Sequence, residues 1–184
     1  MKISQSIFTD KKYLFLDRDG VINKRKVGAY ITSWDLFEFL PGVLEAVAVF
    51  SKHFDRIFII TNQQGIGKGL MSHEDLNTIH KRMEEAITEA GGKIDHIYYC
   101  AQLKDEVSNC RKPSLYMARE ALQDYPEIDF NKSLMIGDTK TDMEFAKNAG
   151  MTAVLLENEH SGDLEKSLCD FSITTLTEFS NLLK

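Results

Sequence analysis

Short runs of apolar residues recur along the chain, and each run has the length of one buried β-strand. The first, residues 13–16, reads Tyr-Leu-Phe-Leu without a charged position, which is typical of a strand covered on both faces. The same kind of run predicts further strands at 56–60, 94–99, 134–136 and 153–156, with an edge strand at 171–173.

The segments between these runs carry apolar residues at helical spacing and have clear start and stop signals. Ser72 with Asp75 three positions later is a capping box, and the apolar stripe that follows it ends at Gly91. Similar signals predict helices after Pro41 and Gly42, after Pro113, from a cap at Thr141 with Glu144 to Gly150, and over residues 176–183.

Strands that alternate with helices predict a Rossmann-like three-layer α/β sandwich with a central parallel sheet. No repeat or linker divides the chain, so we expect residues 1–184 to form a single domain. Residues 23–40 lack a helical pattern and are expected to form a small flap over the site, as a loop or a hairpin, with no large cap domain. Ligands of such sheets bind beyond the carboxyl ends of the strands.

Composition narrows the classes of partner. The chain has 184 residues, 43% of them hydrophobic, and a net charge of −6, which argues against nucleic acid and anionic membranes as partners. Residues 1–6 contain no apolar run of an export signal, and the three cysteines lack a disulfide-framework spacing. We therefore expect a cytoplasmic protein, as a monomer, and a small phosphorylated metabolite remains compatible with its charge.

Acidic residues follow the first and the fourth predicted strands. Gly20 permits a sharp turn that would bring Asp17 and Asp19 to one reacting centre, one carboxyl ionised and the other protonated. Taken alone, a solvated acidic turn explains this pair equally well. After the fourth strand, Asp138 is placed to ligate a hard cation such as Mg²⁺, and Asp142 is expected both to cap the next helix and to join the site.

Polar and basic residues follow the second and third predicted strands. Residues 61–69 are rich in glycine and amides, so their backbone N–H groups could cradle a phosphate, with a flexible glycine loop as the alternative. Arg111 and Lys112 stand just before an expected helix start, where cations oppose the helix dipole. That local cost favours a role in binding anionic oxygens, although a surface basic pair is the alternative. The five histidines show no ligand spacing and are expected on surfaces or helix faces.

Four such motifs, in this order at four strand ends, resemble those of the haloacid dehalogenase (HAD) superfamily. The match runs from about residue 13 to residue 156, and its motif residues are Asp17 with Asp19, Thr61, Lys112, and Asp138 with Asp142. The segments DRDGVIN, FEFLPGV, TNQQGIGKG and CRKP are similar to those of subfamily IIIA, which includes the heptose-bisphosphate phosphatases and the histidinol-phosphate phosphatases.

The resemblance implies a role for each motif residue. Asp17 would attack phosphorus, and Asp19 would act first as general acid and then as general base. A Mg²⁺ ion would be held by Asp17, Asp138 and the main-chain carbonyl of Asp19. Thr61 and Lys112 would hold the phosphoryl oxygens.

Further residues would support the reaction or bind the rest of the substrate. Asp142 would position Lys112 or a metal-bound water. The remaining substrate contacts are assigned to Asn62, Lys68 and Arg111, with Lys24 or Arg25 as further cations near the distal part of a sugar phosphate.

The resemblance leaves more than one substrate open. The implied substrate is D-glycero-D-manno-heptose 1,7-bisphosphate, from which the 7-phosphate would be removed. The segment NQQGIGKG favours this heptose type, whereas the short loop between Cys100 and Cys110 has the histidinol-phosphate phosphatase length. A non-catalytic phosphate-binding protein is a third alternative, although no catalytic position is missing.

One loop departs from these relatives, which often hold a structural zinc in a CxH…CxC site before RKP. Cys100 and Cys110 remain here, while Gln102 and Ser108 stand at the other two ligand positions. Two thiolates with an amide and a hydroxyl do not complete a tetrahedral zinc shell. We therefore predict that structural zinc is absent and that both cysteines are thiols.

Overall fold

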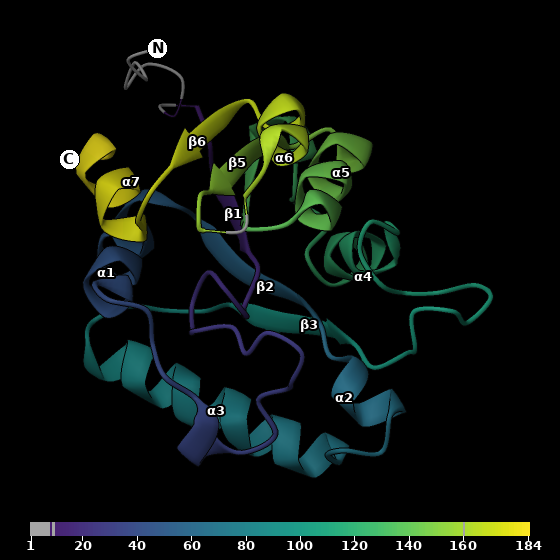
Figure 1. Ribbon diagram of the computed structural model, residues 1–184. Helices are drawn as coiled ribbons and strands as arrows, with labels where there is room; N and C mark the ends of the chain where they lie inside the picture. The colour runs from purple at the N-terminus through teal and green to yellow at the C-terminus, as the bar shows by residue number, and fades with distance from the viewer. Residues whose placement is uncertain (1–7, 9, 160) are drawn as a thin grey trace.

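The computed structural model describes residue 8 and residues 10–159 and 161–184 (Figure 1). Residues 1–6, on which the expectation about an export signal depends, lie outside the described residues, as does His160. No helix in the described ranges is both long enough and apolar enough to cross a membrane.

The described residues form one six-stranded parallel sheet with the strand order β3-β2-β1-β4-β5-β6. All six predicted strands are confirmed, with ends that differ by a residue or two. The strands are β1 (Tyr13–Leu16), β2 (Arg56–Asn62), β3 (His96–Cys100), β4 (Ser133–Gly137), β5 (Thr152–Leu156) and β6 (Phe171–Ile173). The order reverses direction between β1 and β4, and sheets of this kind bind ligands at that switch point.

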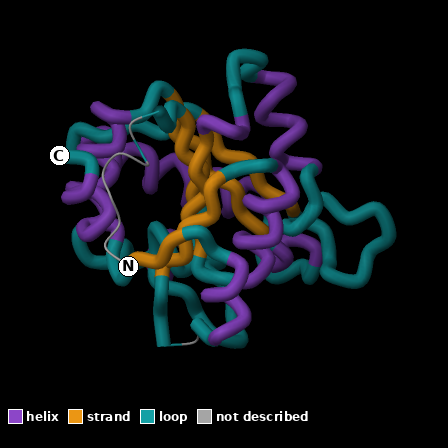
Figure 2. Tube along the Cα trace, turned by 90° about the horizontal axis from the view of Figure 1, so that it is seen from above, coloured by secondary structure: helices purple, strands orange, loops and turns teal. Residues whose placement is uncertain are grey.

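Helices cover both faces of the sheet, so the predicted three-layer sandwich is confirmed (Figures 1 and 2). One face packs against α1 (Val43–His53), α3 (His73–Glu89) and α7 (Leu176–Leu182). The other face packs against α4 (Tyr116–Asp124) and α5 (Lys140–Ala149), and α6 (Asp163–Leu168) lies beside α5.

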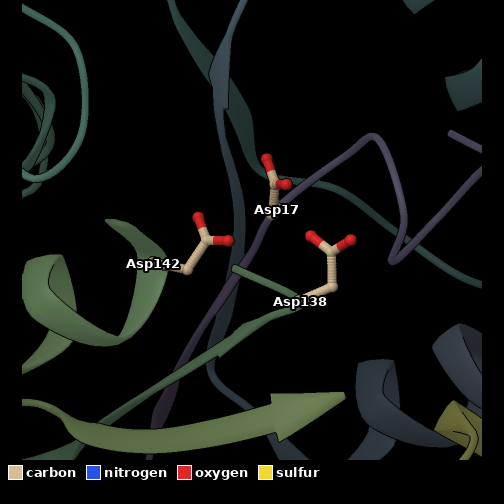
Figure 3. Close-up of side chains that lie close together, drawn as sticks. All are labelled: Asp17, Asp138 and Asp142. Atoms are coloured by element: carbon tan, nitrogen blue, oxygen red, sulfur yellow. The ribbon is translucent and has the colours of Figure 1, made fainter. Parts of the chain in front are cut away.

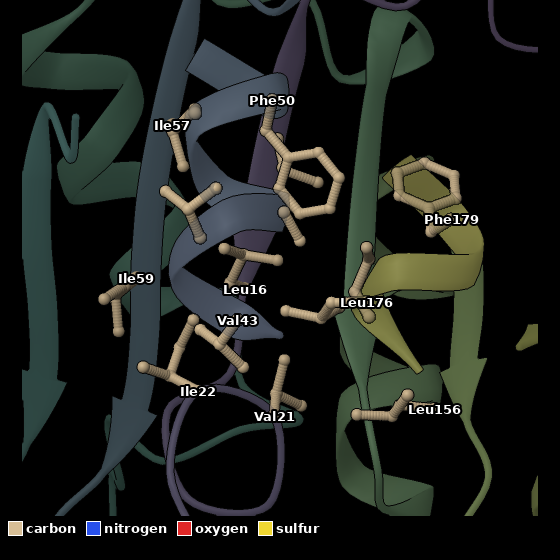
Figure 4. Packing of buried hydrophobic residues seen from close by; sticks show 14 of the residues in the cluster. Leu16, Val21, Ile22, Val43, Phe50, Ile57, Ile59, Leu156, Leu176 and Phe179 are labelled. Atoms are coloured by element: carbon tan, nitrogen blue, oxygen red, sulfur yellow. The ribbon is translucent and has the colours of Figure 1, made fainter. Parts of the chain in front are cut away.

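The apolar run of each central strand fills both layers of the core. In β1, Leu14 and Leu16 face the α1 side, while Tyr13 and Phe15 face the α4 and α5 side. On the α1 side, the rings of Phe50 and Phe179 pack edge to face at 5.5 Å (Figure 4). Burying each such side chain contributes about 1.5–3 kcal/mol, so the sheet is a rigid base for the loops at its carboxyl edge.

Helix starts were predicted less accurately than strands. The capping box of α3 is confirmed, with the Asp75 N–H donating to Ser72 Oγ at 3.1 Å. The predicted cap of α5 at Thr141 is wrong, because Thr139 with Asp142 forms the capping box and the helix begins at Lys140. The helix after Pro113 begins only at Tyr116. Four short helices of the described residues follow no strong periodic pattern and were not predicted: α2 (Gln64–Gly67), α6, and the 3-10 turns η2 (Trp34–Leu36) and η3 (Phe130–Lys132).

The segment between β1 and α1 is a loop closed at its base, and it is not a regular hairpin. A single antiparallel bridge joins Asn23 to Phe39, and the 3-10 turn η2 (Trp34–Leu36) lies between them. Trp34 stacks on Phe37 with ring centroids 5.0 Å apart, and it packs against the core. Other residues of the segment, 26 and 29–31, lie at the carboxyl edge of the sheet.

Candidate active site

Parallel pairing brings the ends of β1, β2 and β4 to one level. Leu16 pairs with Ile59 on one side and with Ile136 on the other, and the Asp17 N–H donates to the Ile136 carbonyl at 2.9 Å. A cavity of about 280 Å³ opens at this edge. Of the predicted site residues, its lining includes Asp17, Asp19, Thr61, Asn62, Arg111, Lys112 and Asp142. Residues from each of the four motifs therefore line one cavity, while Asp138 lines a neighbouring pocket that shares Arg25 with it.

Lys112 is the buried cation of this cavity. Its ammonium group donates to Asp17 Oδ1 at 2.8 Å and to the Ile60 carbonyl at 2.7 Å, and it lies 2.5 Å from Asp142 Oδ1. Burial alone would lower the pKa of Lys112, but the carboxylates of Asp142 and Asp17 outweigh burial and raise it. Lys112 therefore stays charged and fixes one oxygen of Asp17.

Asp142 both caps a helix and joins the site. Its Oδ2 accepts from the Thr139 N–H at 3.0 Å and from the Thr139 hydroxyl at 2.5 Å, while its Oδ1 faces Lys112. The side chain reaches this position because Gly137 has no Cβ, since a Cβ there would overlap that of Asp142. The two expected roles of Asp142 are thus compatible, because each uses a different oxygen.

Three buried carboxyl groups face a common space at the ends of β1, β4 and α5 (Figure 3). One oxygen from each of Asp17, Asp138 and Asp142 lies within 4.8 Å of the others. Burial raises the pKa of Asp17 to about 6, and the charge of Asp142 adds to this against the opposing effect of Lys112. Burial, followed by the charge of Asp17, raises the pKa of Asp138 to about 8. The cluster carries more negative charge than Lys112 alone offsets.

This cluster fits a hard divalent cation, which prefers carboxylate and carbonyl oxygens. The loop cation Arg25 already lies against it, with its Nη2 donating to Asp138 Oδ1 at 2.8 Å and to the Asp19 carbonyl at 2.9 Å. Gly20 makes the close approach possible, because it adopts a φ of +98° and a Cβ there would overlap the Asp138 carboxylate. The predicted sharp turn at Gly20 is confirmed.

The carboxylate of Asp19 accepts hydrogen bonds on both of its oxygens. Arg18 Nη2 donates to both at 2.8 and 3.0 Å, Asn23 Nδ2 donates to Oδ1 at 2.9 Å, and Gln63 Nε2 donates to Oδ2 at 2.8 Å. Burial alone would raise the pKa of Asp19, but the Arg18 charge and these hydrogen bonds lower it. The pKa values of the two carboxyls in this motif therefore shift in opposite directions, that of Asp17 up to about 6 and that of Asp19 down.

The residues that hold Asp19 were missed by sequence reasoning. Arg18 is fully buried between the two aspartates of its motif and also contacts His80 Nε2 at 3.1 Å. Burial, followed by the Arg18 charge, lowers the pKa of His80 to about 3, so its ring is neutral and accepts. Of the two expected places for the histidines, His80 takes a helix face and not the surface, because it lies buried on the inner side of α3.

Other predicted residues hold the loops of the site. Asn62 pairs with the backbone of Lys112, accepting from its N–H at 3.0 Å and donating to its carbonyl at 3.4 Å. Thr61 is buried, and its hydroxyl accepts from Gln63 at 2.9 Å. Lys68 is not part of the cavity lining, because its ammonium lies 5.3 Å above the ring of Tyr30, which does line it.

Four N–H groups of the glycine-rich segment after β2 are already used within the protein. The segment forms α2, and the N–H groups of Ile66, Gly67, Lys68 and Gly69, in and just after this helix, all donate to protein carbonyls. The Gly67 bond reaches the Ala101 carbonyl at 3.1 Å, in the loop after β3. The prediction is wrong for these N–H groups because a contact between two loops already uses them.

The loop between β3 and Lys112 is closed by a Cys100–Cys110 disulfide, with Cα atoms 5.6 Å apart. The prediction that both cysteines are thiols is therefore wrong, because the loop returns to within disulfide distance of its start. Gln102 accepts from the Cys110 N–H at 2.7 Å, and Asn109 donates to the Leu103 carbonyl at 2.6 Å. Side chains of the loop thus bind its own backbone.

Similarity to known proteins identifies the family to which this fold and site belong. A HAD-hydrolase-like family model matches residues 109–177. The D-glycero-alpha-D-manno-heptose-1,7-bisphosphate 7-phosphatase of Mycobacterium bovis is 34% identical over 168 residues, which cover 91% of this chain and 88% of that protein. The enzyme of the same name from Campylobacter jejuni is 36% identical, over 94% of this chain and 96% of that protein.

Solved structures agree with these relatives. The D,D-heptose 1,7-bisphosphate phosphatase from B. bronchiseptica, crystallised with magnesium and phosphate, matches with a TM-score of 0.82 and 30% identity, over 94% of this chain and 97% of that chain. The chain therefore belongs to the HAD-like hydrolases and is a phosphatase of that family.

Proposed function

We propose that this phosphatase removes the 7-phosphate of D-glycero-D-manno-heptose 1,7-bisphosphate in a Mg²⁺-dependent reaction. The observation that carries the proposal is the position of Asp17, whose Oδ1 is fixed by Lys112 at 2.8 Å at the lining of the cavity. The relatives from Mycobacterium bovis and Campylobacter jejuni support the choice of substrate, because both names specify this sugar bisphosphate and the 7-phosphate.

In the proposed reaction, Asp17 is the nucleophile and Asp19 is the acid and base. Asp17 attacks phosphorus and forms an aspartyl-phosphate, while Asp19 protonates the departing sugar oxygen. Asp19 then removes a proton from the water that hydrolyses the intermediate. The lowered pKa of Asp19 suits this second step. For the first step, the negative charge of a bound phosphate would raise that pKa again.

The remaining charges serve phosphoryl transfer, which depends mostly on positioning and charge stabilisation. Lys112 and the Thr61 hydroxyl would hold the phosphoryl oxygens, and Asp142 positions Lys112. Asp17, Asp138 and the Asp19 carbonyl would hold Mg²⁺, which when bound neutralises charge between the nucleophile and the phosphate. Arg111 lines the cavity and suits the distal part of the substrate.

Two further assignments complete the proposal. Asn62 acts through the Lys112 backbone, and Lys68 acts through Tyr30, so both would shape the substrate cavity indirectly. We also propose that residues 1–184 act as one catalytic domain with a small flap. The single sheet with helices on both faces supports this.

Phosphate release from purified protein tests the proposal. Heptose 1,7-bisphosphate in both anomers and histidinol phosphate are compared, with Mg²⁺ and with EDTA. We expect the highest kcat/KM for a heptose bisphosphate, no turnover in EDTA, and restoration by Mg²⁺. Asp17→Asn should lower kcat by more than about a thousandfold, because an amide cannot attack phosphorus. The exposed Asp10→Asn serves as the matched control.

Each arm of this experiment can contradict one part of the proposal. Faster turnover of histidinol phosphate would replace the substrate and leave the mechanism intact. Turnover of Asp17→Asn within tenfold of wild type would remove Asp17 as the nucleophile. Full activity in EDTA would exclude the proposed use of Mg²⁺.

A further inference from the structure

Arg25 extends from the loop after β1 to the centre of the acidic cluster. Its Nη2 lies 2.8 Å from Asp138 Oδ1, 2.9 Å from the Asp19 carbonyl oxygen and 3.6 Å from Asp17 Oδ2. Its Nε also donates to the Asp19 carbonyl at 3.2 Å. A single nitrogen atom thus approaches one oxygen from each of three different residues.

These three oxygens are the ligand set proposed above for the divalent cation. Mg²⁺ binds oxygen at about 2.0–2.1 Å, so an ion bonded to the same three atoms would overlap Arg25 Nη2. Two positive charges at one position would also repel each other. Arg25 and the metal ion therefore cannot share this space.

Charge explains why a cation is held here. Asp17, Asp138 and Asp142 are buried together, and the single charge of Lys112 does not balance this cluster even when one of its carboxyls holds a proton. Lys112 cannot also serve Asp138, because its three N–H groups already face Asp17, Asp142 and the Ile60 carbonyl. Arg25 is the cation in contact with Asp138.

Arg25 is also able to leave. Its side chain is 37% exposed, whereas that of Lys112 is 2% exposed, so solvent already reaches part of the guanidinium. The backbone around it belongs to the flap, where Lys26 and Tyr30 line the catalytic cavity. Rotation of one side chain would free the three oxygens without disturbing the sheet.

We propose that Arg25 is the resident counter-ion of the metal-free site and that a divalent cation must displace it in order to bind. The inference rests on the metal site of the proposed function. It adds a competing group from the chain itself, so that metal binding is coupled to withdrawal of Arg25 from the cluster.

Calorimetric titration of metal-free protein with Mg²⁺ alone, without substrate, tests the coupling. Arg25→Gln removes the competing charge and should bind Mg²⁺ about tenfold more tightly than wild type, the order expected for a charged hydrogen-bonded pair. Lys24→Gln is the matched control, because it removes the same charge from the neighbouring residue. The Lys24 side chain pairs with Glu38 and not with the acidic cluster. The Mg²⁺ affinity of Lys24→Gln should equal that of wild type.

Melting temperatures give a second readout. In EDTA, Arg25→Gln should melt below Lys24→Gln, and saturating Mg²⁺ should close that gap. Arg25→Lys, which keeps the charge on a different head group, should fall between Arg25→Gln and wild type in Mg²⁺ affinity.

The possible failures are distinguishable. Equal or weaker Mg²⁺ binding by Arg25→Gln, with wild type binding normally, overturns the displacement and leaves the metal site in place. An equal gain in Lys24→Gln also overturns it, since the effect would then be one of net charge. Absence of Mg²⁺ binding in wild type overturns the proposed metal site and the inference together.

Discussion

Among single residues, Gly20 shows most clearly how backbone conformation determines the chemistry of this site. Its φ of +98° turns the chain immediately after Asp19 and directs the Asp19 carbonyl toward Asp138. The Asp138 carboxylate then occupies the space that a side chain at position 20 would fill. Any residue other than glycine would have to displace a proposed metal ligand.

Gly20→Ala should therefore lose turnover and Mg²⁺ affinity, each by more than about tenfold, because the added methyl group overlaps a proposed metal ligand. Gly28→Ala is a close control, since Gly28 also has a positive φ, of +73°, but has open space around its Cα. The control should lose about 1–2 kcal/mol of stability at most and keep its Mg²⁺ affinity. Equal loss of Mg²⁺ affinity in both variants, measured by calorimetry, would contradict this account.

Residues of the site were predictable from sequence where a reactive or polar side chain stands at the carboxyl end of a buried strand. Asp17 and Asp138 directly follow β1 and β4, and Thr61 lies in the last two residues of β2, so parallel pairing brings all three to one edge. Arg25 was expected near the distal part of the substrate and contacts Asp138 instead, and His80 was not expected at the site. They come from the flap and from α3, and their approach depends on the path of the chain in space. No local pattern distinguishes them from surface residues.

Among the elements, strands were predicted better than helix ends. The strands are buried on both faces, so their apolar runs are unambiguous. For α5, both Thr139 with Asp142 and Thr141 with Glu144 fit the spacing of a capping box. The close approach of Asp142 to Gly137 favours the first of these two caps. That approach depends on the three-dimensional fold, so the local sequence could not show it.

The loop between Cys100 and Cys110 leads to a prediction about metal content. Gln102, one of the two residues expected not to complete a zinc site, accepts a hydrogen bond from the Cys110 backbone. Protein purified without added metal should carry far less than one zinc per chain, because an amide and a hydroxyl are poor zinc ligands. Cys100→Ser should keep nearly unchanged turnover, since Asn62 still holds the Lys112 backbone.

Elemental analysis and thiol titration check this prediction. Unfolded protein prepared without reductant should expose only the thiol of Cys169, since the other two cysteines form the disulfide. Stoichiometric zinc together with three reactive thiols would show that the loop is a metal site after all.

At the scale of the whole molecule, the buried carboxyl groups make stability depend on pH. The pKa of Asp138 is raised from 3.8 to about 8, mainly by burial, so the folded protein retains a proton that the unfolded chain has lost. The stabilisation that results is complete below the pKa of the unfolded chain, and it disappears as the pH rises through the pKa of the folded protein. The pKa of His80 is lowered to about 3, so His80 makes stability rise with pH. This effect is confined to pH values below its ordinary pKa of 6.5.

Metal-free protein should therefore melt at a progressively lower temperature from about pH 6.5 to about pH 8, where the Asp138 effect stands alone. Thermal denaturation in EDTA over this range measures the slope. Saturating Mg²⁺ should abolish it, and so should Asp138→Asn, which removes the titrating group. A melting temperature that rises with pH in EDTA would contradict the raised pKa.

The strand order also determines when this site can form during folding. Asp17 and Lys112 are 95 residues apart in the chain, and β1 lies between β2 and β4, which come from different halves of the sequence. Such non-local contacts require large loops to close first, which slows folding. A nascent chain on the ribosome has Asp17, the proposed nucleophile, early but lacks Asp138 and Asp142 until β4 and α5 have emerged. Catalytic competence should thus appear late in synthesis and all at once.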